Sequence, residues 1–558
     1  MLYPDGATVT AAPSNTAPAH FTPVPPGLPI GQTLGCVCPT SAGRTGALQV
    51  MNGDPVNTAT GAFSETATDL RMAGYGVPFS LTRTYTSTDT SDGMMGPGWN
   101  LSIDMRLSVG TSSATFRAED GSETVFTKSG TAWVTPPGAR ATLSAVTGGF
   151  QLRATGGERL SFDSNGLLTA VLDQRDHGLH FSYTAGVLSS VTDAAGRVVT
   201  VTAAGGRITK VTLPDGRFVQ YTYTAGRLTS FRDAAAGVTT YGYDAGGRLA
   251  TITDPNGHLD VQNTYDATTG RITAQTDALS KTTTYDWNPT FQDTLITDPD
   301  GIQSLDGYSN NVLVFHLNGN GDETDYRYDN QLRLSTVIDP LGNRFAQTYD
   351  ANGNVSGRST AALGAETDTY DADNNLTEHV DGRGHSATFT YDAFDRVLIG
   401  TDRAGRPTTL TYNSFGLVAT RKDARGKKTT YGYDPAGNRV SETSPLGLVT
   451  RHTYDSVGRL TSTVDPRGNV TGAVADEFRT TYGYDALDHV TSTTDPLGHT
   501  RTRAYDPAGN LISETDAALK TTSYGYDLAD HQTTVTDQRG KVTTTSLCLR
   551  FTEFSSTE

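Results

Sequence analysis

Cysteine is almost absent from this sequence. Only Cys36, Cys38 and Cys548 occur in 558 residues. Cys36 and Cys38 are separated by one residue, which is too close for an ordinary disulfide and unlike the usual spacing of zinc ligands. A disulfide scaffold is therefore excluded, and the redox compartment stays open.

Long apolar runs are missing as well. No segment approaches the roughly 20 apolar residues that a membrane-spanning helix needs, so we expect no membrane span. Residues 1–6 lack a basic segment followed by an apolar core, and no Sec signal peptide is visible. Either export follows another route or the true start lies upstream.

Positive charge is also in short supply. The chain carries 60 acidic and 43 basic residues, which give a formal charge of −17. Because an acidic surface repels phosphate backbones, we expect no nucleic-acid partner. Most aspartates are predicted to lie in turns, where Asp caps its own backbone, rather than in an acid-rich site.

The sequence is poor in helix-forming residues and rich in turn-forming residues. Charged residues make up 18% of the chain, which has 60 glycines and six methionines. This composition is typical of an all-β chain of many short strands.

A Tyr-Asp dipeptide recurs along the second half of the chain. Twelve copies occur between Tyr243 and Asp527. From Tyr328 to Tyr454 the spacing is 21 residues six times running, if Tyr412-Asn413 is counted as a variant. A fixed period of this length indicates a repeat architecture.

Each unit carries two turn signals. The first is Asp-x-x-Gly directly after the tyrosine, as in Asp455 to Gly458, and the second is Asp-Pro-x-Gly, as in Asp495 to Gly498. The stretches between the turns alternate at period two and are rich in Thr and Tyr, as in 460–464. Two strands and two turns account for 21 residues, so each repeat is predicted to be one β-hairpin in a long antiparallel meander.

The Tyr-Asp residues are predicted to serve the repeat itself, with Asp in the turn and the Tyr rings stacked from hairpin to hairpin. Ligand contact, as a sugar-stacking ladder, is the alternative. A sheet of this length accumulates twist, so we expect it to coil into a spiral or an open shell. The candidate residues are Tyr243, Asp244, Tyr328, Asp329, Tyr349, Asp350, Tyr370, Asp371, Tyr391, Asp392, Tyr433, Asp434, Tyr454, Asp455, Tyr484, Asp485, Tyr505, Asp506, Tyr526 and Asp527.

The organisation along the chain falls into five parts. We expect a flexible Pro/Ala/Thr-rich lead-in (1–50), a small β-rich domain (51–125), degenerate repeats (126–242), regular repeats (243–546) and an off-register tail (547–558). Nine extra residues near 471–479 are expected to protrude as a loop. Because Leu547-Cys548 stands where the register predicts Tyr-Asp, we expect a truncated or frameshifted product, that is, a fragment.

The unit from Tyr454 to Gly468 resembles the repeat of the Rhs/YD-repeat family, which includes bacterial Rhs polymorphic toxins, toxin-complex subunits and teneurins. Residues 53–61, Leu81 to Tyr85 and Gly96 to Trp99 are similar to the domain that precedes the repeats in many Rhs-type toxins. The resemblance implies a hollow β-shell that encloses a C-terminal toxin or effector region. No PAAR-like delivery domain and no closing Asp-Pro-x-Gly-Leu border are recognised, so the resemblance covers the scaffold only.

No catalytic motif is recognised, and we expect no enzyme, no cofactor and no metal site. The resemblance therefore implies a noncatalytic shell of a secreted Rhs-type toxin used between bacteria, whose partner is its own or a downstream C-terminal toxin region, missing here. A cell-surface or wall-associated adhesin that binds glycans is the alternative.

Overall fold

The computed structural model describes residues 51–52, 55–136, 139–309, 311–362 and 364–545. The expected lead-in (1–50), the off-register tail (547–558) and the three cysteines lie outside these residues. Within them the chain forms 50 β-strands and two short 3-10 helices, and no α-helix. The predicted all-β class is confirmed.

Three small sheets come first along the chain. A five-stranded sheet has the order β1-β2-β3-β4-β7, a four-stranded sheet the order β11-β10-β9-β8, and β5 pairs with β6. Their strands are β1 (Met51–Asn52), β2 (Val56–Asn57), β3 (Ala62–Met72), β4 (Phe79–Thr86), β5 (Asp92–Gly93), β6 (Gly96–Pro97), β7 (Trp99–Leu101), β8 (Arg106–Val109), β9 (Ser113–Arg117), β10 (Glu123–Ser129) and β11 (Ala132–Val134).

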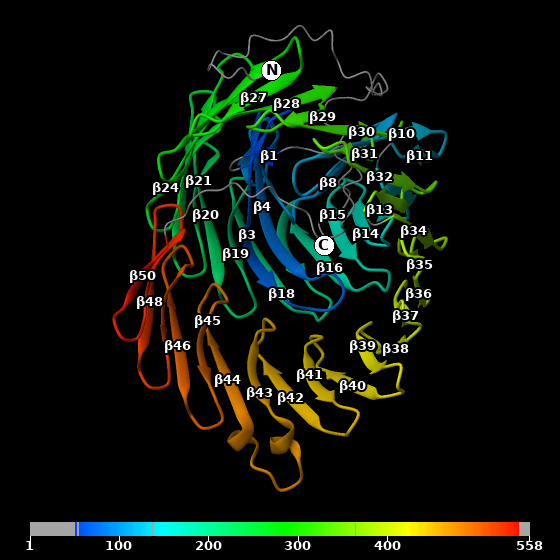
Figure 1. Ribbon diagram of the computed structural model, residues 1–558, viewed down its shortest axis with the longest axis vertical. Helices are drawn as coiled ribbons and strands as arrows, with labels where there is room; N and C mark the ends of the chain where they lie inside the picture. Colours follow the sequence, from blue (N-terminus) through cyan, green and yellow to red (C-terminus); the bar gives the residue numbers. More distant parts are fainter. Residues whose placement is uncertain (1–50, 53–54, 137–138, 310, 363, 546–558) are drawn as a thin grey trace.

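All remaining strands, β12 to β50, form one sheet of 39 strands in sequence order, each antiparallel to the next. Figure 1 shows that this sheet winds around the molecule as a spiral. We call β12–β31 the first coil. Its strands are β12 (Ala141–Val146), β13 (Gly149–Ala154), β14 (Arg159–Asp163), β15 (Leu168–Leu172), β16 (Gly178–Thr184), β17 (Val187–Thr192), β18 (Val198–Ala204), β19 (Arg207–Thr212), β20 (Phe218–Thr224), β21 (Arg227–Arg232), β22 (Val238–Tyr243), β23 (Leu249–Thr253), β24 (Leu259–Tyr265), β25 (Ile272–Asp277), β26 (Thr282–Asn288), β27 (Asp293–Thr297), β28 (Gln303–Ser309), β29 (Val312–Leu317), β30 (Glu323–Tyr328) and β31 (Leu334–Ile338).

The second coil, β32–β50, continues down the right of Figure 1, along the bottom and up the left, where β48 lies near β24. The predicted spiral is therefore confirmed. Its strands are β32 (Arg344–Tyr349), β33 (Val355–Thr360), β34 (Gly364–Tyr370), β35 (Leu376–Val380), β36 (Ser386–Tyr391), β37 (Val397–Thr401), β38 (Pro407–Tyr412), β39 (Val418–Lys422), β40 (Lys428–Tyr433), β41 (Arg439–Thr443), β42 (Val449–Tyr454), β43 (Leu460–Val464), β44 (Arg479–Tyr484), β45 (Val490–Thr494), β46 (Thr500–Tyr505), β47 (Leu511–Thr515), β48 (Thr521–Tyr526), β49 (Gln532–Thr536) and β50 (Val542–Thr544).

The hairpin β42–β43 illustrates the repeat. Tyr454 ends β42 and pairs with Leu460, with a register shift just before it. In the turn, the Gly458 amide donates to the Asp455 carbonyl at 3.1 Å, and the Asp455 amide donates to the Arg459 carbonyl at 3.0 Å. Gly458 has φ +92°, a left-handed conformation that glycine adopts without strain. The Asp-x-x-Gly signal therefore closes this hairpin as a tight turn with a bulge, and in turns without glycine, such as Asp485–Asp488, another residue takes the left-handed conformation.

The insertion between β43 and β44 interrupts the regular spacing of the hairpins. It folds into two 3-10 helices, η2 (Pro466–Asn469) and η3 (Ala475–Phe478), rather than an unstructured loop. The Asn469 side-chain amide donates to three backbone carbonyls, those of Val449, Val464 and Asp465. At the bottom of Figure 1 the insertion extends beyond the neighbouring hairpins.

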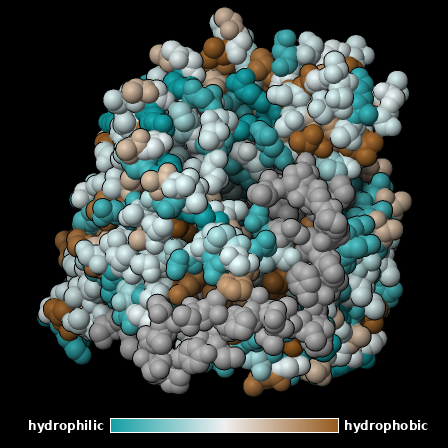
Figure 2. All heavy atoms as spheres, turned by 90° about the horizontal axis from the view of Figure 1, so that it is seen from above, coloured by the Kyte–Doolittle hydropathy of each residue, from teal (hydrophilic) through white to brown (hydrophobic). Residues whose placement is uncertain are grey.

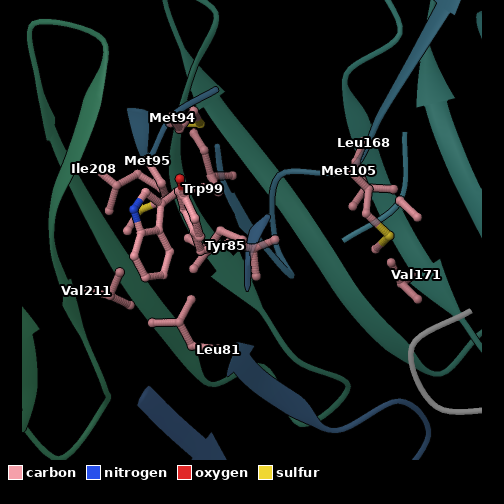
Figure 3. Close-up of a cluster of buried hydrophobic side chains, with 14 of the residues drawn as sticks. Leu81, Tyr85, Met94, Met95, Trp99, Met105, Leu168, Val171, Ile208 and Val211 are labelled. Atoms are coloured by element: carbon pink, nitrogen blue, oxygen red, sulfur yellow. The ribbon is translucent and has the colours of Figure 1, made fainter. Parts of the chain in front are cut away.

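The main hydrophobic core lies between the N-terminal sheets and the first coil. Leu81, Trp99 and Met95 from the N-terminal sheets pack against Ile208 and Val211 of β19, and all five are at most 2% exposed. Figure 3 shows these side chains pointing toward one another. The expected domain boundary between 125 and 126 falls within β10, whereas the long sheet begins at β12.

Candidate functional site

The aspartates of the Tyr-Asp pairs bind backbone within their own turns. In each of the ten predicted pairs, Oδ1 of the aspartate accepts a hydrogen bond from the amide four residues later, at 2.7–3.1 Å. Where the residue four positions after the aspartate is arginine, its guanidinium also pairs with the other carboxylate oxygen, as Arg459 does with Asp455 at 2.6 Å. These carboxylates are therefore engaged inside the turn.

The tyrosines bind backbone of the preceding hairpin. Nine hydroxyls donate to a backbone carbonyl at 2.6–3.2 Å, in most cases 15 residues earlier, as Tyr433 does to Val418. The nine donors are Tyr243, Tyr349, Tyr370, Tyr391, Tyr433, Tyr454, Tyr484, Tyr505 and Tyr526. Each hydroxyl thus ties one repeat to the one before it.

The ring partners of these tyrosines differ from the expectation. The sequence predicts stacking of tyrosine on tyrosine. Instead, the arginine that ends one turn lies over the tyrosine of the next repeat, with Arg333 4.3 Å from the ring centre of Tyr349 and Arg396 4.2 Å from that of Tyr412. Such cation–π contacts contribute about 0.5–1 kcal/mol at exposed sites. This contact of the fifth turn residue with the next tyrosine ring was not predicted from the sequence.

The inner face of the first coil is covered by the N-terminal sheets. Arg83 of β4 forms a buried ion pair with Asp69 at 2.8 Å, with side chains 5% and 1% exposed. Burial opposes the charge on Arg83, but the adjacent Asp69 carboxylate outweighs it and raises the pKa of Arg83. The guanidinium also lies 4.1 Å from the ring centre of Phe231, and Tyr221 donates to Asp69 at 2.6 Å.

Cross-strand pairs on this inner face are buried throughout β16–β27, and all but the hydrogen-bonded pair Asn263/Gln275 are apolar or aromatic. They occupy one register position, two residues before the position held by Tyr183, Ala203, Tyr223, Tyr243, Tyr265 and Trp287, and no member is more than 7% exposed. The apolar or aromatic pairs are Phe181/Val191, Val201/Val211, Tyr221/Phe231, Tyr241/Ile252 and Tyr285/Ile296. The N-terminal sheets therefore form a plug that fills this coil.

The same register position in the second coil carries mostly polar or charged pairs, with Phe389/Gly400 and Tyr524/Val535 as the exceptions. Among them only Asp368 is buried, held by Arg358 at 2.8 Å and by His379 at 2.7 Å. The pairs are Gln347/Arg358, Asp368/His379, Phe389/Gly400, Leu410/Arg421, Tyr431/Glu442, His452/Thr463, Tyr482/Thr493, Arg503/Glu514 and Tyr524/Val535. Figure 2 shows a hollow near the middle of the molecule, with hydrophilic side chains around it.

The two coils meet along a seam of hairpin turns. Side chains from turns at one edge of the first coil donate to Tyr-Asp turns of the second coil that lie 214–271 residues later. Arg175 donates to the Ser414 carbonyl at 2.6 Å, and Arg217 binds both the Ala486 carbonyl and the Asp488 carboxylate. The Tyr-Asp turns thus also form the contact between the two coils.

The loop between β3 and β4 reaches into this seam. The Tyr75 hydroxyl donates to the Ala194 carbonyl of the first coil at 2.6 Å. Its ring lies edge-on to His177, with ring centres 5.0 Å apart, and 4.8 Å from the ring of Phe415 in the second coil. The plug is therefore tied to both coils by one aromatic side chain.

Comparison with known proteins agrees with this architecture. The model of a family described as RHS Repeat matches residues 224–259, 370–407, 412–449, 433–470, 454–500 and 505–542. A second model, described as Domain of unknown function (DUF6531), matches residues 53–126. No curated protein matches the sequence significantly.

Among solved structures, TcdB2-TccC3 without its hypervariable C-terminal region is similar over 82% of this chain and 26% of its own, with 14% identity and a TM-score of 0.51. The pore form of the Photorhabdus luminescens Tc holotoxin, with TccC3-D651A, matches with 15% identity and a TM-score of 0.45. This chain spans about a quarter of the length of either structure. Within the described part of the chain, no helix has the length and apolar character that would carry it across a membrane.

Proposed function

The chain belongs to the RHS repeat family, and we propose that it forms the wall of a shell that surrounds a separate effector region. The family resemblance deduced from the Tyr-Asp units is thereby confirmed, and the fold is that of the TcdB2-TccC3 structure. We further propose that this shell is part of a secreted toxin that bacteria use against one another.

The observation that carries the proposal is the polar inner face of the second coil. The first coil buries its inner face on the plug, whereas the equivalent pairs of the second coil, such as Arg503/Glu514 and Tyr482/Thr493, stay half-exposed. A curved wall with half-exposed polar pairs inside suits a hydrated interior that holds a polypeptide without binding it tightly.

The Tyr and Asp of the repeats support a noncatalytic wall. Nine of the ten hydroxyls and all ten carboxylates are engaged by backbone groups of the same or an earlier hairpin, as for Tyr433 and Asp434. We infer that these twenty residues, together with the turn arginines, hold the wall rather than bind a ligand. The similar TcdB2-TccC3 structure comes from a protein with a hypervariable C-terminal region, which is the kind of segment proposed as the content.

Reading the coding DNA beyond codon 558 in all three frames is the first test. Further Tyr-Asp units followed by an unrelated small domain would support the proposal. A stop codon with nothing related downstream would contradict it.

Protease protection of the extended gene product is the second test. We expect the downstream segment to resist trypsin while it is joined to the wall, and to be cleaved when the seam is loosened by Arg217→Ala. Arg451→Ala, on an exposed residue of β42, is the matched control and should leave protection unchanged. Equal cleavage of the joined and the isolated segment would rule out enclosure.

A further inference from the structure

One position of the seam brings two acidic turns together. The turn Asp254–His258 lies between β23 and β24 of the first coil, and the turn Asp527–His531 lies between β48 and β49 of the second. Asp254, His258 and Asp530 each offer a ligand atom, and these atoms all lie within 4.8 Å of one another. Asn256 of the same first-coil turn donates to Asp506 at 3.1 Å, so the two coils are in contact here.

At a neighbouring position of the seam, the equivalent aspartate meets a cation. Asp488, the fourth residue of its turn like Asp530, accepts from Arg217 of the first coil at 2.6 Å and from Arg459 at 3.0 Å. The first-coil groups facing Asp530 are instead the Asp254 carboxylate and the His258 imidazole. Two carboxylates brought together across an interface repel each other unless a positive charge lies between them.

The conformation of Asp530 gives a second reason for a specific role. It has φ +59°, a left-handed conformation that costs a non-glycine residue energy, and glycine occupies this position in most turns of the repeat. One oxygen of Asp530 accepts from Asn510 at 2.7 Å. One oxygen of Asp254 accepts from the His258 amide at 2.7 Å. Each carboxylate therefore keeps one oxygen for another partner.

The His258 ring differs from its counterpart in an otherwise matching turn. In Asp495-Pro-Leu-Gly-His499, Nδ1 of the histidine is hydrogen-bonded to the aspartate at 3.0 Å. In Asp254-Pro-Asn-Gly-His258, Nδ1 is shielded from solvent, has no hydrogen-bond partner within the described residues and lies 3.3 Å from the Asp254 carboxylate. The same turn sequence thus leaves a buried nitrogen without a hydrogen-bond partner at the place where a second carboxylate, that of Asp530, approaches.

We propose that Asp254, His258 and Asp530 bind one divalent transition-metal ion of the zinc class, which clasps the second coil to the first. One imidazole nitrogen with two carboxylate oxygens suits zinc better than calcium or magnesium, which prefer all-oxygen sites. Three protein ligands leave one position of a tetrahedral ion for water. The ion supplies the positive charge that Arg217 supplies to Asp488.

Titration of the EDTA-stripped chain with zinc chloride, followed by calorimetry, tests the site. We expect one tight site per chain, whose affinity falls at least about tenfold in Asp530→Asn and in His258→Gln. His499→Gln is the matched control, because it removes a histidine from the same turn sequence where no second carboxylate among the described residues completes a metal-ligand cluster, and it should leave the tight site intact. Circular dichroism checks that the variants keep the β-fold.

Hydrogen exchange of the turn 527–531 tests the clasp separately from binding. Zinc should slow exchange of these amides in the unsubstituted chain and in His499→Gln, and should have no effect in Asp530→Asn. The proposal is overturned if both variants bind zinc as tightly as the unsubstituted chain, if no tight site is found, or if zinc binds without protecting this turn. None of these outcomes depends on whether the wall encloses an effector.

Discussion

In the first coil Phe181 and Val191 face each other as a buried pair, whereas at the same register of the second coil Tyr482 faces Thr493 and both are half-exposed. The two hairpins close with different turns, Ala185-Gly186 in the first coil and Asp485–Asp488 in the second, but each carries a tyrosine-to-carbonyl hydrogen bond to an earlier strand, from Tyr183 to Leu168 and from Tyr484 to Leu460. The hairpin hydrogen bonds therefore determine the backbone structure of both coils. Whether the inner-face side chains are apolar or polar depends on whether the N-terminal sheets pack against them. The plug buries the inner face of the first coil, whereas the inner face of the second coil stays half-exposed.

The largest expected difference between the coils concerns charge. Arg83→Ala leaves Asp69 buried without its partner, and we expect the free energy of unfolding to fall by about 3–5 kcal/mol. Arg503→Ala removes an ion pair with Glu514 whose side chains are 32% and 25% exposed, and should cost only about 0–1 kcal/mol. Urea unfolding followed by circular dichroism measures both. Equal losses would mean that the second coil is filled as well.

The next difference concerns aromatic packing. Phe181→Ala removes a ring that is 7% exposed and should cost about 3 kcal/mol, the low end for a buried phenylalanine. Phe389 occupies the same register position in the second coil and is half-exposed, so Phe389→Ala should cost less than about 2 kcal/mol. The same unfolding experiment compares the two variants, and a reversed order would contradict the plug.

A smaller difference concerns the tyrosine hydroxyls. Tyr433→Phe removes one hydrogen bond to the Val418 carbonyl and should cost about 1 kcal/mol. Tyr243→Phe in the first coil removes a bond to the Leu228 carbonyl and also leaves the Trp99 indole N–H without its acceptor. We therefore expect a loss of about 1–3 kcal/mol for Tyr243→Phe. Thermal unfolding of the two variants side by side gives the comparison.

A further expected difference is one of pH dependence. Burial, with the nearby acidic groups Asp120 and Glu158, raises the pKa of Glu119 in the plug to about 8. The folded state then holds a proton that the unfolded chain releases near pH 4–5, so this contribution to stability is lost as the pH rises toward 8. Glu119→Gln should remove this slope, which stability curves between pH 5 and 9 would reveal. An unchanged slope in this variant would contradict the assignment to Glu119.

The turn aspartates of the second coil should respond in the opposite direction. At Asp455, burial acts to raise the pKa, but the amide and guanidinium of Arg459 outweigh it and lower the pKa. This contribution is complete above the pKa of an unfolded aspartate, near 4, and is lost as the pH falls through the lower folded value. Acid therefore weakens the turns, whereas alkali weakens the plug. Asp455→Asn should reduce the acid-side loss, and an unchanged loss would contradict this.

The sequence predicted the local structure because the local signals are complete within about 21 residues. Period-two alternation, Asp-x-x-Gly turns and the Tyr-Asp spacing each depend on neighbours in the same hairpin, so the strands and turns follow from them. The nine-residue insertion was located correctly, but its two 3-10 helices depend on Asn469 reaching three carbonyls, which spacing does not reveal.

The plug and the seam could not be predicted in the same way. Arg217 and Asp488 are 271 residues apart, and each already has a local role in its own turn. The ion pair of Arg83 and Asp69 lies against β20–β22, and nothing in the local pattern of β4 distinguishes a buried arginine from an exposed one. The proposed zinc-class site could not be predicted from the sequence for the same reason, because its third ligand, Asp530, comes from the other coil.

Thiol labelling of the inner face tests the central claim most directly. After replacement of the three native cysteines by serine, Val191→Cys and Thr493→Cys place one thiol at the same register position of each coil. A small maleimide should label the thiol at 493 in the native protein, and the thiol at 191 only after unfolding. Equal protection of both thiols, or equal reactivity of both, would contradict a filled first coil and an open second coil.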